Sequence, residues 1–298
     1  MGYIATILIL LSIYTMLVLS ANLTVGMAGL LTLCQAAFYG IGAYVGALFM
    51  MQFHLPFLVI AAIVMVATGA FSLLISQASV RLKGNYFVIA TMGFQTIIYT
   101  ILYNLSWDDK NGSKIGGSYG IFIEDNIHIL GLYELRSDLA YLILSLAVCI
   151  VVILLMRHLM KSPFGRVLNA IRTNEQQVQS YGRNTAMVRS WAFFISAAVS
   201  GLAGLLFAIS TQFVLPQSFG LDASIFILCA LFIGGTGNIK GSIIGAAFMV
   251  LLPELLRIIG INEAPAASLR QIIYGLILIF VMFLRPHGLK LKITHQKP

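Results

Sequence analysis

The chain has 298 residues, of which 59% are hydrophobic and only 9% carry a charge, and its mean hydropathy is +0.95. Soluble domains carry roughly 25% charged residues, so this composition excludes a water-soluble globular protein and leaves no room for a large soluble domain. The predicted fold class is all-α and polytopic, a single transmembrane domain over residues 1–298. The formal net charge of +8 would also suit a nucleic-acid or anionic partner, and the placement of the charges decides that question.

Apolar stretches of about 20 residues, the length that crosses a bilayer as a helix, recur along the chain. The first lacks the positively charged start of a signal peptide and is longer than its apolar core, so we expect it to remain as a membrane helix. The second is long and glycine-rich, which predicts a broken or tilted span. We expect 8–10 membrane helices, near residues 3–21, 24–51, 55–80, 85–105, 138–160, 189–211, 222–238, 241–260 and 268–285.

The loops between these spans divide by charge. One set is basic with a single acid, Glu175, whereas the alternate set holds the remaining acids. Because basic loops stay cytoplasmic, we predict a multi-pass protein of the inner or plasma membrane, with the middle loop (161–188) and the C-terminus cytoplasmic. The loop at 106–138 is then external, and so is the N-terminus unless the first apolar stretch is re-entrant. No nucleic-acid partner is expected. The basic set comprises Arg81, Lys83, Arg157, Lys161, Arg166, Arg172, Arg183, Arg189, Lys240, Arg285, Lys290, Lys292 and Lys297.

The middle loop contains the polar stretch GRVLNAIRTNEQQVQSYGRN, Gly165–Asn184. Ser162–Gly165 provides a break, Asn174 can cap a helical turn and Gly182 can end one, which predicts one or two short helices across the cytoplasmic face. One interpretation is an interfacial helix on anionic lipid headgroups. The other is a docking element for a cytoplasmic partner, favoured by exposed Asn, Gln and Ser. The apolar positions are Val167, Leu168, Ile171, Val178 and Tyr181.

Four segments, in this order, resemble the permease subunits of ABC importers for branched-chain amino acids, the LivM-like family. The last of them contains a Gly-Gly-x-Gly turn and the run Leu-Pro-Glu-Leu-Leu. The resemblance covers nearly the whole chain. The four segments are Asn22–Phe49, Arg81–Ile98, Gly165–Asn184 with the span that follows it, and Phe213–Arg257.

The resemblance implies a cytoplasmic coupling helix in the middle loop. In the family, a Glu followed at short spacing by a Gly marks the helix that sits in a cleft of the ATPase subunit; here these residues are Glu175 and Gly182. The general importer pattern begins Glu-Ala-Ala, whereas this chain has Glu175-Gln176-Gln177. The candidate ATPase-coupling residues are Gly165, Arg166, Arg172, Glu175 and Gly182.

The function implied by the resemblance is that of a transmembrane permease subunit in an ATP-driven importer. The substrates would be branched-chain amino acids, or related small amino acids and amides, delivered by an extracytoplasmic binding protein. The implied partners are a second homologous permease in a heterodimer, two ABC ATPase subunits, the solute-binding protein and the lipid bilayer. Urea and short-chain amides are used by close relatives of the family and remain an alternative.

No nucleotide site is expected in this chain itself. The run GGTGNIKGS, Gly234–Ser242, completes neither the dinucleotide-binding nor the Walker pattern and lies between apolar spans. ATP would therefore be bound by the partner ATPase subunits, and the chain would carry no cofactor. The five histidines are scattered without metal-ligand spacing, and no Ser/His/Asp set can be assembled, so neither a metal site nor enzymatic activity is expected.

Polar residues within the spans are the candidates for a translocation pathway. Asn and Gln also bond across membrane helices, so a purely structural role is the alternative for each. Acidic residues are absent from the middle of the spans, which argues against a self-contained secondary transporter driven by protons or sodium. The candidate pathway residues are Asn22, Gln35, Asn85, Thr91, Gln95 and Asn104.

The external loop and the small residues spaced by four each have both a functional and a purely structural interpretation. In the external loop, Ile115–Ile121 resembles a family run of Thr-Gly-Gly-x-x-Gly-Ile, which implies contact of the binding protein with Gly116, Gly117 and Tyr119; a solvated connector is the alternative. Small residues spaced by four predict close helix packing, which is either static or allows helices to slide. These are Gly42 with Gly46, Gly241 with Gly245, and Ser200 with Gly204 and Ala208.

Overall fold

The computed structural model describes residues 2–53, 55–82, 84–108, 114–123, 138–258 and 275–276. Six helices in this part of the chain are long and apolar enough to cross a membrane, which confirms the polytopic helical fold. The predicted span at 268–285 and the C-terminus lie almost wholly outside the described residues. The six spans are Tyr3–Met27, Gln35–Phe53, Phe57–Gln77, Asn85–Asn104, Leu139–Lys161 and Thr185–Thr211.

Most helices follow one another with short connections, and the longest connection, residues 105–137, joins α4 to α5. They are α1 (Tyr3–Ala21), α2 (Gln35–Phe53), α3 (Phe57–Arg81), α4 (Asn85–Asn104), α5 (Asp138–Lys161), α6 (Pro163–Thr173), α7 (Glu175–Ser180), α8 (Thr185–Thr211), α9 (Leu221–Gly234) and α10 (Ile239–Ile258). A π-helical turn, η1 (Asn22–Met27), continues α1, and two short 3-10 turns are η2 (Gly117–Tyr119) and η3 (Pro216–Phe219). The strands form two antiparallel pairs, β1 (Ser106–Asp108) with β2 (Lys114–Gly116), and β3 (Ile121–Phe122) with β4 (Phe213–Val214).

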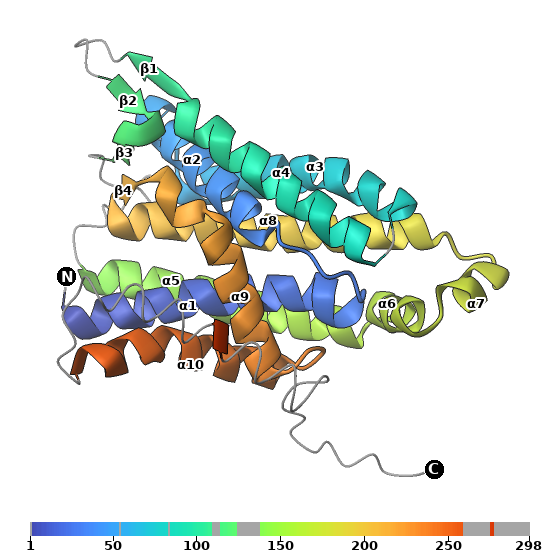
Figure 1. Cartoon of the computed structure of the whole chain (residues 1–298). Helices are drawn as coiled ribbons and strands as arrows, with labels where there is room; N and C mark the ends of the chain where they lie inside the picture. Colours follow the sequence, from blue (N-terminus) through green and yellow to red (C-terminus); the bar gives the residue numbers. More distant parts are fainter. Residues whose placement is uncertain are drawn as a thin grey trace.

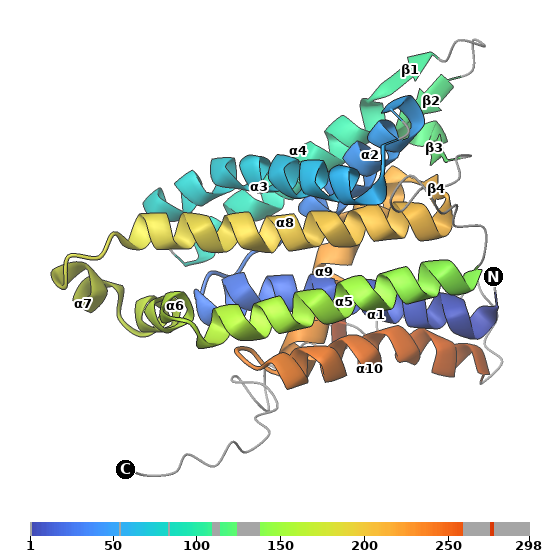
Figure 2. The same ribbon diagram turned by 180° about the vertical axis from the view of Figure 1, so that it is seen from behind.

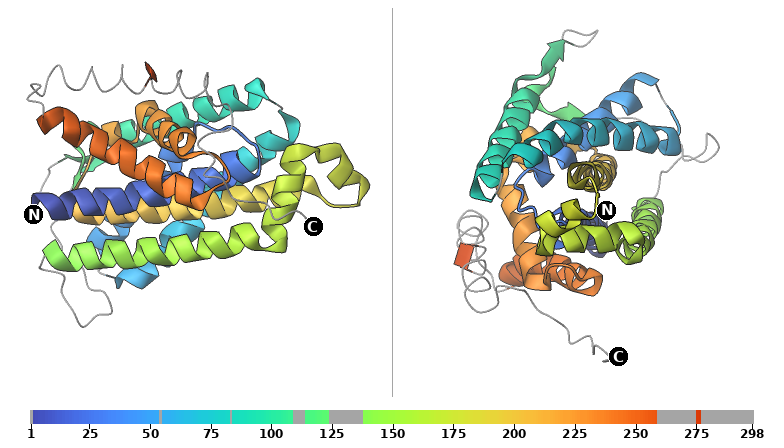
Figure 3. Two further views of the ribbon diagram at one scale, coloured as in Figure 1. Left: turned by 90° about the horizontal axis from the view of Figure 1, so that it is seen from below. Right: turned by 90° about the vertical axis from the view of Figure 1, so that its right-hand side faces the viewer.

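Helix α8 lies between two groups of helices (Figures 1 and 2). Helices α2, α3 and α4 lie on one side of it, and α1, α5 and α10 lie on the other. It packs most extensively against α2 and α3 and also contacts α1, and it is the most buried of the six spans. Figure 3 (right) views the bundle from the end that carries α6 and α7. The centre of the bundle is thus a helix that begins directly after the polar middle loop.

The two connecting regions singled out in the sequence lie at opposite ends of the bundle (Figure 1). Helices α6 and α7 are at one end, here called the α6–α7 end, and the short strands and the N-terminus are at the other. This arrangement is consistent with the prediction that the loops at 106–138 and 161–188 face opposite sides of the membrane. Which end is cytoplasmic remains a prediction from the basic loops.

The predicted span at 24–51 was wrong in its bounds. The first span continues through η1 to Met27, and α2 begins only at Gln35, with non-helical backbone between them. Gly29 adopts a φ of 71°, which favours glycine and turns the chain away from the helix axis. Hydropathy runs unbroken through this segment, so periodicity alone could not locate the interruption.

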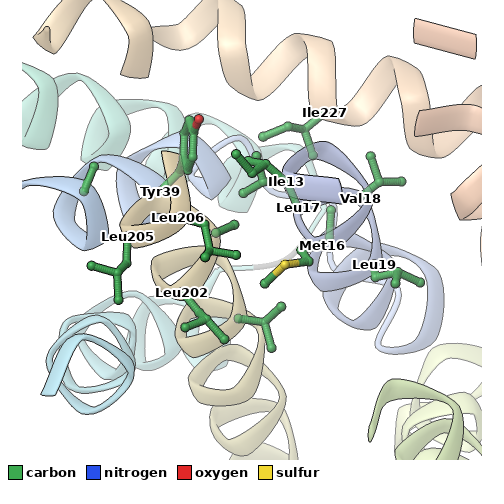
Figure 4. Close-up of a cluster of buried hydrophobic side chains, with 14 of the residues drawn as sticks. Ile13, Met16, Leu17, Val18, Leu19, Tyr39, Leu202, Leu205, Leu206 and Ile227 are labelled. Atoms are coloured by element: carbon green, nitrogen blue, oxygen red, sulfur yellow. The ribbon is translucent and has the colours of Figure 1, made fainter. Parts of the chain in front are cut away.

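The glycines of α2 and α8 allow the backbones of these two helices to touch. A Cβ atom added to Gly42 would lie 2.2 Å from the carbonyl oxygen of Gly201, and one added to Gly204 would lie 2.1 Å from that of Tyr39. Apolar side chains surround this contact: Figure 4 shows Leu202, Leu205 and Leu206 of α8 with side chains of α1, α2 and α9. The small residues spaced by four therefore serve close packing.

We expect Gly42→Ala to destabilise the protein by about 1–3 kcal/mol, because the added methyl group has no space against Gly201. The measurement is the thermal unfolding midpoint of the purified protein in detergent. The matched control is Gly93→Ala on α4, where nothing lies within 4 Å of the added atom. Equal midpoints for the two variants would contradict the close contact of α2 with α8.

Candidate functional site

The interrupted segment, residues 28–34, ends at the start of α2 deep inside the bundle. Gln35 donates from Nε2 to Ser196 Oγ at 2.9 Å and accepts from Ser200 Oγ at 3.1 Å. Ser196 lies about three turns, or about 17 Å, along α8 from its first residue at the α6–α7 end. Non-helical backbone at such depth is tolerated only where protein partners satisfy it.

Side chains from three elements satisfy backbone N–H groups around this segment. The Leu33 N–H donates to Thr91 Oγ1 of α4 at 3.2 Å, and the Cys34 N–H donates to Thr32 Oγ1 at 3.3 Å. The Ala36 N–H, in the first turn of α2, donates to Ser224 Oγ of α9 at 3.0 Å. Thr91, Thr32 and Ser224 are buried, so these bonds take the place of helical ones inside the protein.

Gln95 joins the same network from α4. Its Nε2 donates to the Phe219 carbonyl oxygen at 2.7 Å, and its Oε1 accepts from Ser224 Oγ at 3.5 Å. Phe219 belongs to the 3-10 turn that precedes α9. Three of the predicted pathway residues, Gln35, Thr91 and Gln95, thus surround the starts of α2 and α9.

Asn22 occupies a separate position, where α1 passes into η1. Its Nδ2 donates to Ser242 Oγ at 2.8 Å and to the Asn238 carbonyl oxygen at 3.3 Å, and its Oδ1 accepts from the Gly237 N–H at 2.7 Å. The side chain thereby attaches α1 to the turn between α9 and α10. Asn85 and Asn104 are exposed at the two ends of α4 and join neither group. A pathway role for all six residues stays a prediction.

The middle loop forms two short helices, as predicted, and a capping residue precedes each helix that starts there. Ser162 Oγ accepts from the Gly165 N–H at 3.4 Å at the start of α6, and Asn174 Oδ1 accepts from the Gln177 N–H at 3.2 Å at the start of α7. Asn184 accepts from the Met187 N–H at 3.1 Å and caps α8. These caps satisfy N–H groups that have no partner within the helix and fix where each helix begins.

Glu175 faces the first turns of α8. Its Oε1 lies 2.8 Å from Arg189 Nη1 and accepts from Thr185 Oγ1 at 3.2 Å. The arginine side chain is 10% exposed and the carboxylate side chain 22%, so the ion pair is largely shielded from water. The pair holds α7 against α8 beside an open pocket of about 310 Å³, which is lined by Glu175, Gln179, Arg183, Asn184, Thr185, Ala186 and Arg189.

Of the remaining candidate coupling residues, Gly165 is buried, whereas Arg166, Arg172 and Gly182 are exposed. Gly182, with a φ of 75°, ends α7 and has nothing within 4 Å of an added Cβ atom, and Arg166 is also exposed. Gly165 is buried, and a Cβ atom there would lie 2.4 Å from the Met160 carbonyl oxygen, so it serves the packing of α6 on α5. Arg172 is exposed over much of its surface, but its guanidinium group reaches the bundle and donates from Nη1 to the Gly26 carbonyl oxygen in η1.

At the opposite end, the glycines of the predicted binding-protein contact form a tight turn. Gly116 and Gly117 have φ values of 82° and 56°, and the Gly116 N–H donates to the Gly120 carbonyl oxygen at 2.8 Å. The turn leaves the Tyr119 side chain 62% exposed. The structure describes 106–108 and 114–123 of the predicted external loop, and contact with a binding protein stays a prediction.

Sequence reasoning missed several residues of these networks. Ser200 was assigned with Gly204 and Ala208 to helix packing or sliding, and Ser196, four residues before Ser200, was not singled out. Arg189 was counted as a basic loop residue, and its separation from Glu175 in the sequence gives no indication of pairing. Ser224 stands alone in an apolar run, so its bonds become visible only in the fold.

Comparison with known proteins identifies relatives over most of the chain. A family model described as "Branched-chain amino acid transport system / permease component" matches residues 3–282. The high-affinity branched-chain amino acid transport system permease protein LivM of Salmonella typhimurium is 32% identical over 299 residues, covering 93% of this chain and 67% of that protein. The probable LivM permease of Methanocaldococcus jannaschii is 28% identical over 241 residues, 78% of this chain and 66% of the relative.

Another relative, which matches less of the chain, is named for a different solute. The autoinducer 2 import system permease protein LsrC of Salmonella typhi is 33% identical over 139 residues, 45% of this chain and 39% of that protein. No solved structure matches the chain. The chain spans about two thirds of the length of the LivM proteins that it matches.

We expect Glu175→Ala to release α7 from α8, because Arg189 would lose its partner in a largely shielded position, at a cost of about 1–3 kcal/mol. Trypsin should then cleave after the exposed Arg183 at least about fivefold faster, as followed by mass spectrometry of the purified protein. Gln176→Ala, at an exposed position of the same helix, is the control. Equal cleavage rates for native protein and Glu175→Ala would show that the ion pair does not hold α7.

Proposed function

This chain belongs to the family of permease components of branched-chain amino acid transport systems, and we propose that it forms part of the translocation path of an ATP-driven importer. The family consists of non-catalytic membrane subunits of ABC-type transporters. The proposed substrate is a branched-chain amino acid or a related small amino acid, in keeping with the names of the LivM relatives. The LsrC relative is named for another solute, so family membership alone does not fix the substrate of this chain.

The proposed partners are a second homologous permease subunit, two ABC ATPase subunits and an external solute-binding protein. The observation that carries the proposal is the braced α6–α7 loop at one end of the bundle. Its helices are capped and α7 is paired to α8 through Glu175 and Arg189, while Tyr181, Gly182 and Arg183 remain exposed. The α6–α7 loop is thus a rigid element with an exposed polar face, which suits contact with an ATPase subunit.

In the proposed mechanism, the ATPase subunits move the α6–α7 loop when they bind and hydrolyse nucleotide. The Glu175–Arg189 pair passes this motion to α8, which packs on α2 and α3 along their length. The transmembrane helices then exchange between outward and inward access, as two arrangements of one packed core. The chain supplies the two-state path, and the energy comes from nucleotide bound by its partners.

Two alternatives are less well supported. A self-contained secondary transporter does not agree with membership in a family of ABC-type permeases. A permease for urea or short-chain amides is the alternative within the same architecture, because the solute-binding protein sets much of the substrate choice. Competition of valine, isoleucine, urea and acetamide for uptake by the reconstituted system distinguishes these substrates.

We expect Arg183→Glu to reduce co-purification of the ATPase subunits, and uptake with it, at least tenfold, because it reverses the charge of the exposed loop face. Insertion of the permease into the membrane should be unchanged. Arg157→Glu, an exposed arginine at the end of α5 near the same end of the bundle, is the matched control. Solute accumulation by the purified chain alone in vesicles, without nucleotide or companions, would refute the proposed function.

A further inference from the structure

The contact between α6 and η1 links the middle loop directly to the interrupted segment. We propose that Arg172 is a positioning residue that transmits displacement of α6 to residues 28–34, so that this segment rearranges during transport. The inference rests on the proposed function, because α6 is displaced only if an ATPase acts on the α6–α7 loop. It adds a second route into the membrane beside the one through α8.

The side chain of Arg172 lies close to the backbone of three glycines, Gly26, Gly29 and Gly237. Its Nη1 donates to the Gly26 carbonyl oxygen, and a Cβ atom added to Gly29 would lie 2.8 Å from its Cγ. Its Nη1 also lies 3.9 Å from the position of a Cβ atom on Gly237. The arginine therefore packs where η1, the interrupted segment and the α9–α10 turn meet.

The bond to Gly26 has an electrostatic reason. Gly26 lies in the last turn of the continuous helix formed by α1 and η1, whose final carbonyl groups have no partner within the helix. The aligned peptide dipoles make this end negative, and a guanidinium group there is stabilising. Arginine also offers several donors in a fixed plane, whereas lysine offers one compact charge.

Asn22 and Gly237 also pack closely against Gly26, so little free space surrounds this residue. A Cβ atom on Gly26 would lie 1.8 Å from Asn22 Oδ1 and 2.7 Å from the Gly237 nitrogen. Asn22 in turn bonds to Gly237, Asn238 and Ser242. A displacement of α6 that keeps the bond from Arg172 to Gly26 would therefore move η1 and the α9–α10 turn together.

Only a few residues separate this contact from the polar network at the start of α2. From Gly29 to Gln35 the chain can extend by no more than about 20 Å. Along it, the Leu33 N–H depends on Thr91, and Gln35 depends on Ser196 and Ser200. A shift of Gly29 would therefore strain these hydrogen bonds. Rearrangement of the segment would then exchange one discrete set of hydrogen-bond partners for another.

Cys34 provides a reporter within the segment. It is fully buried beside Thr32, so a change in its reaction with N-ethylmaleimide reports rearrangement of residues 28–34. Cys149→Ser and Cys229→Ser leave it as the single cysteine of the chain. The complete importer, with its ATPase subunits and binding protein in vesicles, is labelled without nucleotide and with ATP plus vanadate.

We expect nucleotide to raise Cys34 labelling severalfold in the protein with native Arg172. Arg172→Met keeps the aliphatic part of the side chain but removes the donors. It should retain assembly and nucleotide hydrolysis while uptake and the labelling response fall at least tenfold. Arg172→Lys should restore part of both, because it keeps the charge. Arg157→Met is the matched control and should behave as the native protein.

The outcomes separate this inference from the proposed function. Loss of ATPase assembly in Arg172→Met would make the residue a docking contact and overturn the inference. Native uptake and labelling in Arg172→Met, or Cys34 labelling that never responds to nucleotide, would also overturn it while leaving the importer function in place. If the native complex does not import in response to ATP, the proposed function itself fails.

Discussion

Backbone N–H and C=O groups without partners are costly inside a membrane, and the interrupted segment at 28–34 leads such groups to the middle of the bundle. The structure meets this constraint with buried hydroxyl and amide side chains from neighbouring helices. Thr91 comes from α4, Ser224 from α9, and Gln35 binds two serines of α8. Much of the buried polarity of the described chain therefore gathers around the place where the helix is broken.

This network lies within reach of the α6–α7 end along two routes. One passes through the Glu175–Arg189 pair into α8, whose serines hold Gln35. The other passes through Arg172 into η1 and the short run to α2. Both routes end on Gln35, one through α8 and the other through the chain itself, and they are the paths along which we propose that movement of the middle loop reaches the start of α2. Broken helices near the membrane midplane are a common device of transport proteins, for the same physical reason.

The sequence was sufficient to predict a helical protein with several membrane spans, because apolar length is summed over many residues. The predicted span at 222–238 is an exception, since α9 has only 14 residues. The sequence also located the two short helices of the middle loop, since Ser162, Asn174 and Gly182 are local signals. The length and glycine content of the second apolar segment predicted a broken or tilted span at 24–51, but the sequence did not place the break, because apolar residues continue through it and the φ of Gly29 is visible only in the fold. It could not pair Glu175 with Arg189, because that contact depends on how α7 folds back on α8, or Arg172 with Gly26, because those residues are far apart in the chain.

The most direct test of the account is amide hydrogen exchange over residues 28–36 of the protein in lipid nanodiscs. The account predicts that these amides exchange roughly 100-fold more slowly than those of the exposed residues 181–184. It also predicts that Thr91→Val, which removes the acceptor of the Leu33 N–H, speeds exchange in this segment and leaves α8 unchanged. Exchange over 28–36 as fast as at 181–184, or unaffected by Thr91→Val, would contradict a break sealed by buried side chains.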